Sequence, residues 1–185
     1  MKKCFSLLIL VLIAISCGKE NEVSIIKKNN YSIEIPNDLT ETKLLNDVAS
    51  LQYENQFKEF YVIVIDESKE SLKDFFAPIS ETPNNLDGYS ELLKVNMASV
   101  LGKVDFSKIK TTQINGMKAK VFSVETKIEN LDAYYKFGFF EGKNSYYQVM
   151  LWTLLDKKRE LEPRMQKIID SFKQTNTNRE AKVDN

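Results

Sequence analysis

The chain has 185 residues, with 26 basic and 26 acidic side chains, two cysteines and no histidine. The absence of histidine excludes histidine general-base catalysis and every histidine-ligated zinc or copper site. The balanced charge gives no electrostatic reason to expect nucleic acid as a partner.

The start of the chain has the pattern of a secretory signal. Lys2 and Lys3 precede an almost unbroken apolar run from Phe5 to Ile15. That run is about a dozen residues long, which is short of the roughly 20 that cross a bilayer as a helix. It also lacks the polar face of a helix that packs on a core. We therefore expect residues 1–16 to be a signal peptide that is removed.

This signal ends on a cysteine. Ala14-Ile15-Ser16-Cys17 resembles the lipobox of bacterial lipoproteins, with the cleavage site between Ser16 and Cys17. The resemblance implies that Cys17 is thioether-linked to diacylglycerol and becomes the mature N-terminus, followed by a polar tether that ends at residue 22. It implies a protein of the bacterial cell envelope with the lipid bilayer as a partner, and we expect the outer membrane. A plain secretory peptide is the alternative.

Lipidation would leave the folded domain without a free thiol, because Cys4 leaves with the signal and Cys17 carries the lipid. Disulfides, cysteine nucleophiles and cysteine-ligated metals are then excluded. Residues 23–173, about 150 in number, suit one domain with a single core. The polar residues 174–185 contain no aromatic residue and are expected to form a flexible tail.

The domain is predicted to begin with strands. Tyr31–Ile35 alternates apolar and polar residues before Pro36, which is typical of a strand with one face in water. Phe60–Ile65 is a continuous apolar run rich in β-branched residues and predicts a central strand buried on both faces. Residues 23–26 and 49–53 are further strand candidates.

Helices are predicted in the middle of the chain. Ser68 caps a short helix that Pro78 stops, and the proline- and asparagine-containing residues 81–87 form a loop. From Tyr89 to Leu101, apolar residues recur at three- and four-residue steps, which predicts an amphipathic helix that ends at Gly102.

The second half is predicted to be mainly β. Asn115-Gly116 is a two-residue hairpin signal between strands 109–114 and 117–128. Strands 133–140 and 146–154 follow, and a closing helix spans 161–172, with Pro163 tolerated only in its first turn. This order predicts an α+β fold, a mainly antiparallel β-sheet flanked by helices.

The same order resembles the PsbP and DcrB-like superfamily. The resemblance rests on Tyr31–Pro36, the valine- and isoleucine-rich strand, the middle helix, the Asn115-Gly116 hairpin, the strand with Tyr146-Tyr147-Gln148-Val149 and the helix with Ile168–Phe172. It covers residues 23–173 and implies a small α-β-α sandwich, exported and often lipid-anchored. It also implies a non-enzymatic role in binding partners or assisting complex assembly, with no catalytic motif and no cofactor.

Aromatic residues are dense from Tyr134 to Trp152. On a strand, Tyr135, Phe137 and Phe139 would share one face, and Tyr134 and Phe140 the other. One interpretation is that one of these faces packs in the core and the other covers the surface of the sheet. The other is an aromatic surface for a partner or an apolar ligand, and Tyr134, Phe140 and Tyr146 are its candidate residues.

Charged clusters give weaker signals. Asp66, Glu67, Glu70 and Asp74 form the clearest acidic cluster, but no calcium-loop pattern accompanies it, so we expect a solvated helix start and no metal site. Lys157, Lys158, Arg159 and Arg164 are expected to form a solvated basic face.

Enzyme chemistry has no support in the motifs. No glycine-rich phosphate loop and no Gly-x-Ser-x-Gly elbow occurs in the sequence. We therefore expect a non-catalytic binding or complex-assembly accessory domain, anchored outside the cytoplasm and partnered by an envelope protein complex. Two alternatives remain: a carrier with a small apolar ligand in a sheet–helix groove near Tyr147 and Trp152, and a hydrolase that uses only carboxylates.

Overall fold

The structure is a computed structural model that describes residues 22–28, 30–76, 84–101 and 104–175. Its strands are β1 (Val23–Lys27), β2 (Tyr31–Pro36), β3 (Thr40–Glu41), β4 (Leu51–Asn55), β5 (Phe60–Ser68), β6 (Val104–Phe106), β7 (Lys110–Ile114), β8 (Met117–Ile128), β9 (Leu131–Glu141), β10 (Ser145–Leu154) and β11 (Lys173–Gln174). Its helices are α2 (Lys69–Phe76), α3 (Leu86–Leu101) and α4 (Lys158–Ser171), with short 3-10 turns η3 (Gln56–Lys58) and η4 (Leu155–Lys157).

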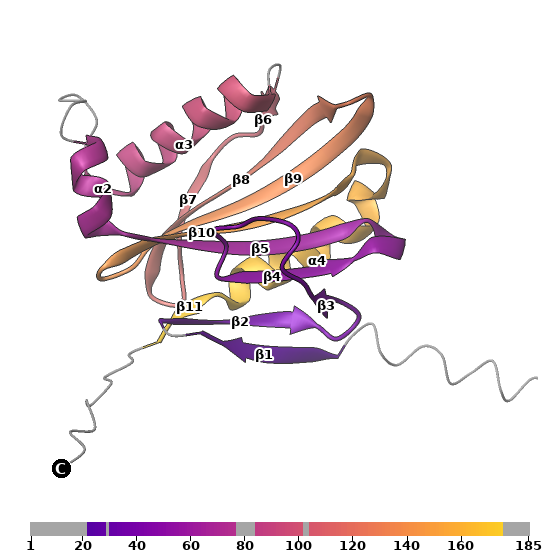
Figure 1. Ribbon diagram of the computed structural model, residues 1–185, viewed down its shortest axis with the longest axis horizontal. Coiled ribbons are helices and arrows are strands. Elements are labelled where there is room, and N and C mark those ends of the chain that lie inside the picture. Colours follow the sequence, from indigo (N-terminus) through magenta and orange to yellow (C-terminus); the bar gives the residue numbers. More distant parts are fainter. Residues whose placement is uncertain (1–21, 29, 77–83, 102–103, 176–185) are drawn as a thin grey trace, which may run out of the picture.

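Eight strands form one large antiparallel sheet in the order β3-β4-β5-β10-β9-β8-β6, with β7 paired to β8 beside β6. A second sheet has the order β1-β2-β11. Helices α2 and α3 lie on one face of the large sheet, and α4 with the small sheet lies on the other (Figure 1). The predicted α+β fold, a mainly antiparallel sheet flanked by helices, is confirmed.

The larger core lies between the large sheet and α4. Leu161, Met165, Ile168 and Ile169 form the buried face of α4, and this apolar stripe packs on β9 and β10. Strand β2 closes the same core with Tyr31, whose ring stacks on Phe172 at a centroid distance of 5.2 Å.

A second core lies under α3. Tyr89 of α3 is fully buried and stacks on Tyr146 of β10, with ring centroids 4.5 Å apart. Phe122 and Phe137 lie beneath the same helix, with centroids 5.0 Å apart. Because cores lie on both faces, strands β9 and β10 are buried from both sides over much of their length.

The Asn115-Gly116 turn joins β7 to β8 as predicted. Both residues have positive φ, 48° and 80°, which is the backbone that a two-residue hairpin of this type requires. The amide of Asn115 donates hydrogen bonds to the carbonyl oxygens of Asp170 and Phe172, both at 2.9 Å. The hairpin therefore also fixes the end of α4.

Several boundaries differ from the prediction: α3 begins at Leu86, inside the predicted 81–87 loop, and two further differences lie near the end of the chain. Helix α4 begins at Lys158, so Pro163 lies beyond its first turn. The neighbouring Glu162 fixes this part of the helix to the sheet by accepting hydrogen bonds from Tyr134 and Lys136. The prediction that Gln174 belongs to the flexible tail is wrong, because it pairs with Tyr31 in β11. Residues 176–185, the rest of that predicted tail, lie outside the described residues.

Candidate functional site

The three aromatic residues expected to form a binding surface are buried. Tyr134, Phe140 and Tyr146 each have 0% of their surface exposed. The Tyr134 hydroxyl donates to the Glu162 carboxylate of α4 at 2.6 Å, while Phe140 packs on Phe172. They therefore belong to the two cores and form no exposed surface, because helices cover both faces of β9 and β10.

Three other aromatic residues are partly exposed and lie together on the sheet. Tyr61, Trp152 and Tyr135 lie directly opposite one another on the neighbouring strands β5, β10 and β9. Their rings form a row: Tyr61 and Trp152 have centroids 5.1 Å apart, and Trp152 and Tyr135 are 6.1 Å apart, with interplanar angles of 13° and 22°. We call these three residues the aromatic row.

The aromatic row lies on the α3 face of the sheet. Tyr135 alternates along β9 with Phe137 and Phe139, and these two rings pack in the core beneath α3. The predicted alternation of faces along β9 is therefore correct. Helix α3 packs on β8 and β9, which leaves the row only partly covered.

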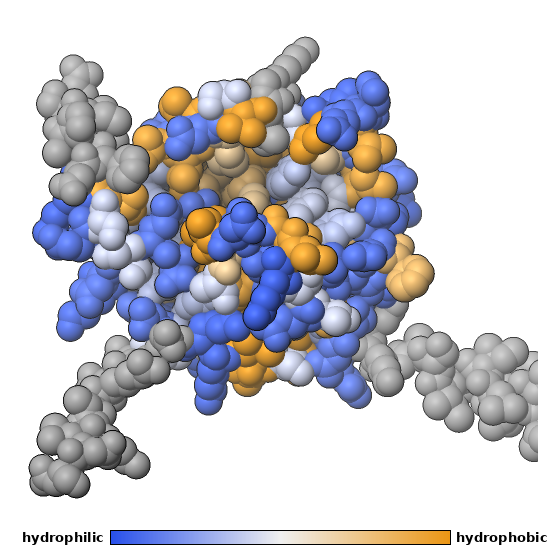
Figure 2. All heavy atoms as spheres, in the orientation of Figure 1, coloured by the Kyte–Doolittle hydropathy of each residue, from blue (hydrophilic) through white to orange (hydrophobic). Residues whose placement is uncertain are grey.

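A loop faces α3 across this part of the sheet. Gln52 of β4 holds it, because its side-chain oxygen accepts from the backbone N–H groups of Leu45 and Asn46 at 2.9 and 3.0 Å. Leu44 and Val48 of this loop are 88% and 73% exposed. Figure 2 shows the molecule hollowed below α3, with hydrophobic side chains gathered on either side of the hollow.

The row offers apolar rings together with hydrogen-bond donors. The Tyr61 hydroxyl donates to Glu59 at 3.1 Å, but within the described residues neither the Tyr135 hydroxyl nor the Trp152 indole N–H has a hydrogen-bond partner. Burial raises the pKa of Tyr135, so its hydroxyl stays protonated at neutral pH. Such a surface can bind, and the row itself contains no nucleophile or general base.

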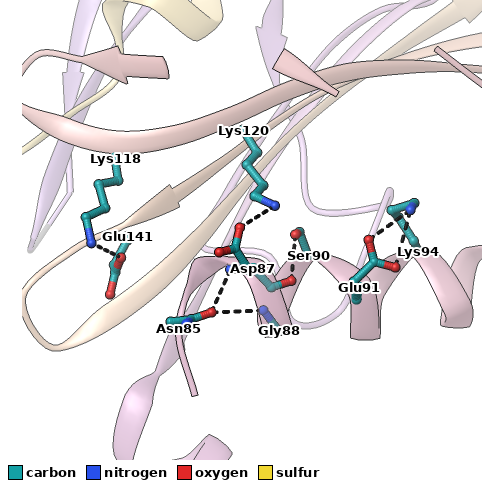
Figure 3. A network of polar contacts seen from close by, with 9 residues as sticks. All are labelled: Asn85, Asp87, Gly88, Ser90, Glu91, Lys94, Lys118, Lys120 and Glu141. Carbon is teal, nitrogen blue, oxygen red and sulfur yellow. Dashed lines mark hydrogen bonds and ion pairs between the residues drawn. The ribbon is translucent and has the colours of Figure 1, made fainter. Parts of the chain in front are cut away.

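A second hollow, of about 480 Å³, lies at the start of α3, and most of the residues that line it are polar or charged. Lys120 of β8 pairs with Asp87 in the first turn of α3 at 2.6 Å, and Lys118 pairs with Glu141 at 3.5 Å (Figure 3). The Asn85 side chain caps α3 by accepting from the N–H groups of Asp87 and Gly88. Each lysine already pairs with a carboxylate, so these ion pairs connect β8 to α3 and to β9.

The acidic cluster does not converge on a metal site. Glu67 accepts hydrogen bonds from Tyr89 and Gln148, and Glu70 pairs with Lys73 at 2.7 Å. Within the described residues, no group of three or more metal-ligating side chains occurs. The carboxylate of Glu67 instead connects β5 to α3 and β10.

The predicted basic face is partly engaged in ion pairs. Lys158 contacts Glu125 at 2.7 Å, and Arg164 forms a two-pronged pair with Asp38. Lys58 also contacts Asp38, at 3.1 Å. Asp38 thus joins α4 to the turns at one end of the sheet.

The predicted lipidation residue Cys17 and the cleavage-site residue Ser16 lie outside the described residues. In the part of the chain that the structure describes, no helix is both long and apolar enough to cross a membrane.

The sequence matches no family model, and a search of curated proteins finds no match. Solved structures do resemble the chain. Cyanobacterial PsbP from Synechocystis is 12% identical with a TM-score of 0.60, and the match covers 86% of this chain and 98% of that one. The chain has a PsbP-like fold.

Two further structures share this fold. LpqN of Mycobacterium tuberculosis, a protein involved in cell envelope biogenesis, is 8% identical with a TM-score of 0.53 over 84% of this chain and 91% of its own. A Pseudomonas aeruginosa protein of unknown function is 13% identical with a TM-score of 0.51, over 82% and 96% of the two chains. At these identities the likeness concerns the fold alone.

Proposed function

We propose that this chain is a lipid-anchored, non-catalytic binding domain of the bacterial cell envelope that assists the assembly of a protein complex, and that the aromatic row is its binding surface. The partly exposed stack of Tyr61, Trp152 and Tyr135 carries the proposal. Large aromatic side chains are enriched in the energetically dominant parts of protein interfaces, so an ordered row of them is a suitable docking surface.

The available side chains favour binding over catalysis. The sequence contains no histidine, and its only cysteines are Cys4 and Cys17 at the start of the chain. In the described residues, both carboxylates that line the hollow at the start of α3 are engaged, Asp87 with Lys120 and Glu141 with Lys69 at 3.1 Å. At the aromatic row, Glu59 accepts from the Tyr61 hydroxyl. A hydrolase that uses carboxylates alone needs two acids free to converge on one substrate.

The envelope location has two supports. The Ala14–Cys17 pattern resembles a lipobox, and two acyl chains on one cysteine would make the attachment stable. LpqN, which is involved in cell envelope biogenesis, shares the fold. The outer membrane remains our preferred site.

The favoured occupant of the hollow is an apolar segment of a partner protein. Leu44 and Val48 on the loop extend the apolar surface beyond the row, which suits a segment larger than a single small molecule. The alternative is a small apolar ligand, and the Tyr135 hydroxyl without a partner favours it, because one donor can orient such a ligand.

A site-specific crosslink tests the proposal. A photoreactive residue placed at Val48 in the full-length lipoprotein should capture one envelope protein in living cells, and Trp152→Ser should abolish that capture. The same residue at Ile25, which is 61% exposed on β1, is the matched control and should not capture it. Equal capture from both positions, or capture that survives Trp152→Ser, would refute the assigned surface.

The same preparations separate the alternatives. If the hollow binds a small ligand, mass spectrometry of solvent extracts should find an apolar molecule with the wild-type protein and not with Trp152→Ser, and no protein crosslink should form. Replacing Cys17 with Ser should move the protein from the membrane fraction to the soluble fraction. Unchanged membrane association would refute the anchor.

A further inference from the structure

Phe57 is the most exposed large apolar residue in the described part of the chain, with 99% of its surface open to water. It lies in η3, between β4 and β5. The turn around it is well defined: the Asn55 side chain accepts from the N–H of Lys58 at 3.0 Å, and Glu59 has a φ of 51° and donates its N–H to Gln56. The ring is therefore held in water by an ordered turn.

A chain of hydrogen bonds links this turn to the first described residue. The Asn37 N–H donates to the Glu22 carbonyl oxygen at 2.9 Å, and the next residue, Asp38, accepts from the Asn55 side chain at 2.8 Å through its own carbonyl oxygen. The β4–β5 turn and the start of β1 consequently lie at the same end of the molecule, as Figure 1 shows at its right side.

The length of chain before β1 limits how far this end can lie from the lipid. Only six Cα–Cα steps separate Cys17 from Val23, and a fully extended chain covers about 3.6 Å per step, so the reach is about 20 Å. Val23 is itself 49% exposed. An anchor at Cys17 therefore keeps the end with Phe57 close to the bilayer.

We infer that Phe57 inserts into the interfacial region of the bilayer and serves as a second contact that orients the domain. The inference rests on the lipid anchor of the proposed function. Phenylalanine gains from leaving water for the headgroup–acyl boundary, and one weak contact becomes effective when the anchor already holds it near the surface.

The orientation has a consequence for the aromatic row. Strands β4 and β5 meet at the η3 turn, so an inserted Phe57 places these strands end-on to the membrane. The hollow between α3 and the loop with Leu44 and Val48 then opens sideways, parallel to the bilayer. A partner held in the same membrane would meet this hollow from the side.

Two positions on opposite ends of the sheet can report this orientation. Gln56 is exposed beside Phe57, and Lys143 is exposed in the turn between β9 and β10. Strand β5 runs from Phe60 at one end to Ser68, which pairs with Ser145, at the other. Nine residues at about 3.3 Å each separate the two ends by about 25–30 Å.

The experiment uses the full-length lipoprotein in phosphatidylcholine vesicles that contain a nitroxide-labelled lipid. A fluorophore is attached to Gln56→Cys or, as the matched control, to Lys143→Cys. We expect severalfold stronger quenching at position 56 than at position 143. Adding Phe57→Ser to the Gln56→Cys protein should lower its quenching toward that of the control, while thermal melting remains unchanged.

The outcomes separate this inference from the proposed function. Equal quenching at both positions, stronger quenching at position 143, or quenching at position 56 that survives Phe57→Ser overturns the role of Phe57. Flotation of the same vesicles tests the anchor: protein that does not float overturns the anchor and this inference together. Capture from Val48 tests the aromatic row and does not depend on Phe57.

Discussion

Trp152 stacks on Tyr61 across β10 and β5, with ring centroids 5.1 Å apart and an interplanar angle of 13°. Each ring restricts the rotamers of the other, so the exposed part of the row is formed before any partner arrives. A preformed aromatic surface loses little conformational entropy on binding.

Trp152 is the only tryptophan of the chain, so its fluorescence reports the state of the hollow. We predict that an apolar probe such as anilinonaphthalene sulfonate quenches Trp152 emission and that Tyr135→Ser weakens this quenching. Because Trp152 is only half-buried, Trp152→Ala should lower the free energy of unfolding by about 1–2 kcal/mol, less than a fully buried ring would cost. Fluorescence titration and urea unfolding measure the two effects.

The matched variant for this prediction is Ile25→Ser, which removes an exposed apolar side chain from the small sheet. It should leave both probe binding and Trp152 quenching unchanged. Probe binding that is lost in Ile25→Ser but retained in Tyr135→Ser would place the apolar site on the small sheet instead.

Gly138 of β9 lies directly beneath Ile169 of α4, with no room for a side chain. A Cβ at this position would lie 2.9 Å from Ile169 Cγ2 and 2.9 Å from the Phe140 ring. We predict that Gly138→Ala lowers the free energy of unfolding by about 1–3 kcal/mol, because the closely packed helix must move. A double-mutant cycle with Ile169→Ala should show a favourable coupling, measured by urea unfolding. Strict additivity would contradict the contact.

Local patterns in the sequence predicted most of the fold. The Asn115-Gly116 hairpin was recognisable because two consecutive positive φ values favour this residue pair. The predicted helix cap at Ser68 is confirmed, because its hydroxyl accepts from the N–H of Glu70 at 3.2 Å just before α2. The chain from Asp66 to Ser68 also continues β5, because it pairs with β10. Such pairing across long sequence separations leaves no local signal, and the same is true of β11 with β2.

The candidate site was less predictable than the fold. The sequence predicts Tyr61 on a strand buried on both faces, and it places Trp152 only near a possible groove. Both are partly exposed because α3 packs on β8 and β9 and does not extend fully over β5 and β10. The area that a helix covers depends on tertiary packing, so residue types alone favoured Tyr134, Phe140 and Tyr146, which lie beneath the helices.

Asp38 should make stability depend on acid. Burial alone would raise the pKa of Asp38, but hydrogen bonds and ion pairs with Arg164 and Lys58 together hold it below its ordinary value of 3.8. A carboxyl with a lowered folded pKa stabilises the fold fully above its unfolded pKa, and this contribution is lost as the pH falls through the folded pKa. Asp38→Asn should therefore cost about 1–3 kcal/mol at pH 7, and urea unfolding should show this difference shrinking below pH 3.8.

The exposed pair of Glu70 and Lys73 provides the control for Asp38. Their side chains are 80% and 57% exposed, and such pairs contribute little in water. Glu70→Gln should change the unfolding free energy far less than Asp38→Asn at pH 7. An equal decrease in the free energy of unfolding for the two variants would show that the contacts of Asp38 do not stabilise the fold.

Thr153 places a hydroxyl in the core without a partner. Only 2% of the residue is exposed, and its Oγ1 has no hydrogen bond within the described residues. A buried polar atom without a partner loses its hydration and gains nothing in return, so Thr153→Val should maintain or raise the free energy of unfolding, by up to about 1 kcal/mol. Tyr31→Phe is the contrasting variant, because the Tyr31 hydroxyl lies 2.8 Å from the Ser50 hydroxyl and its loss should cost about 1 kcal/mol. Urea unfolding compares the two, and a Thr153→Val protein less stable than Tyr31→Phe would show that the Thr153 hydroxyl has a bonding role.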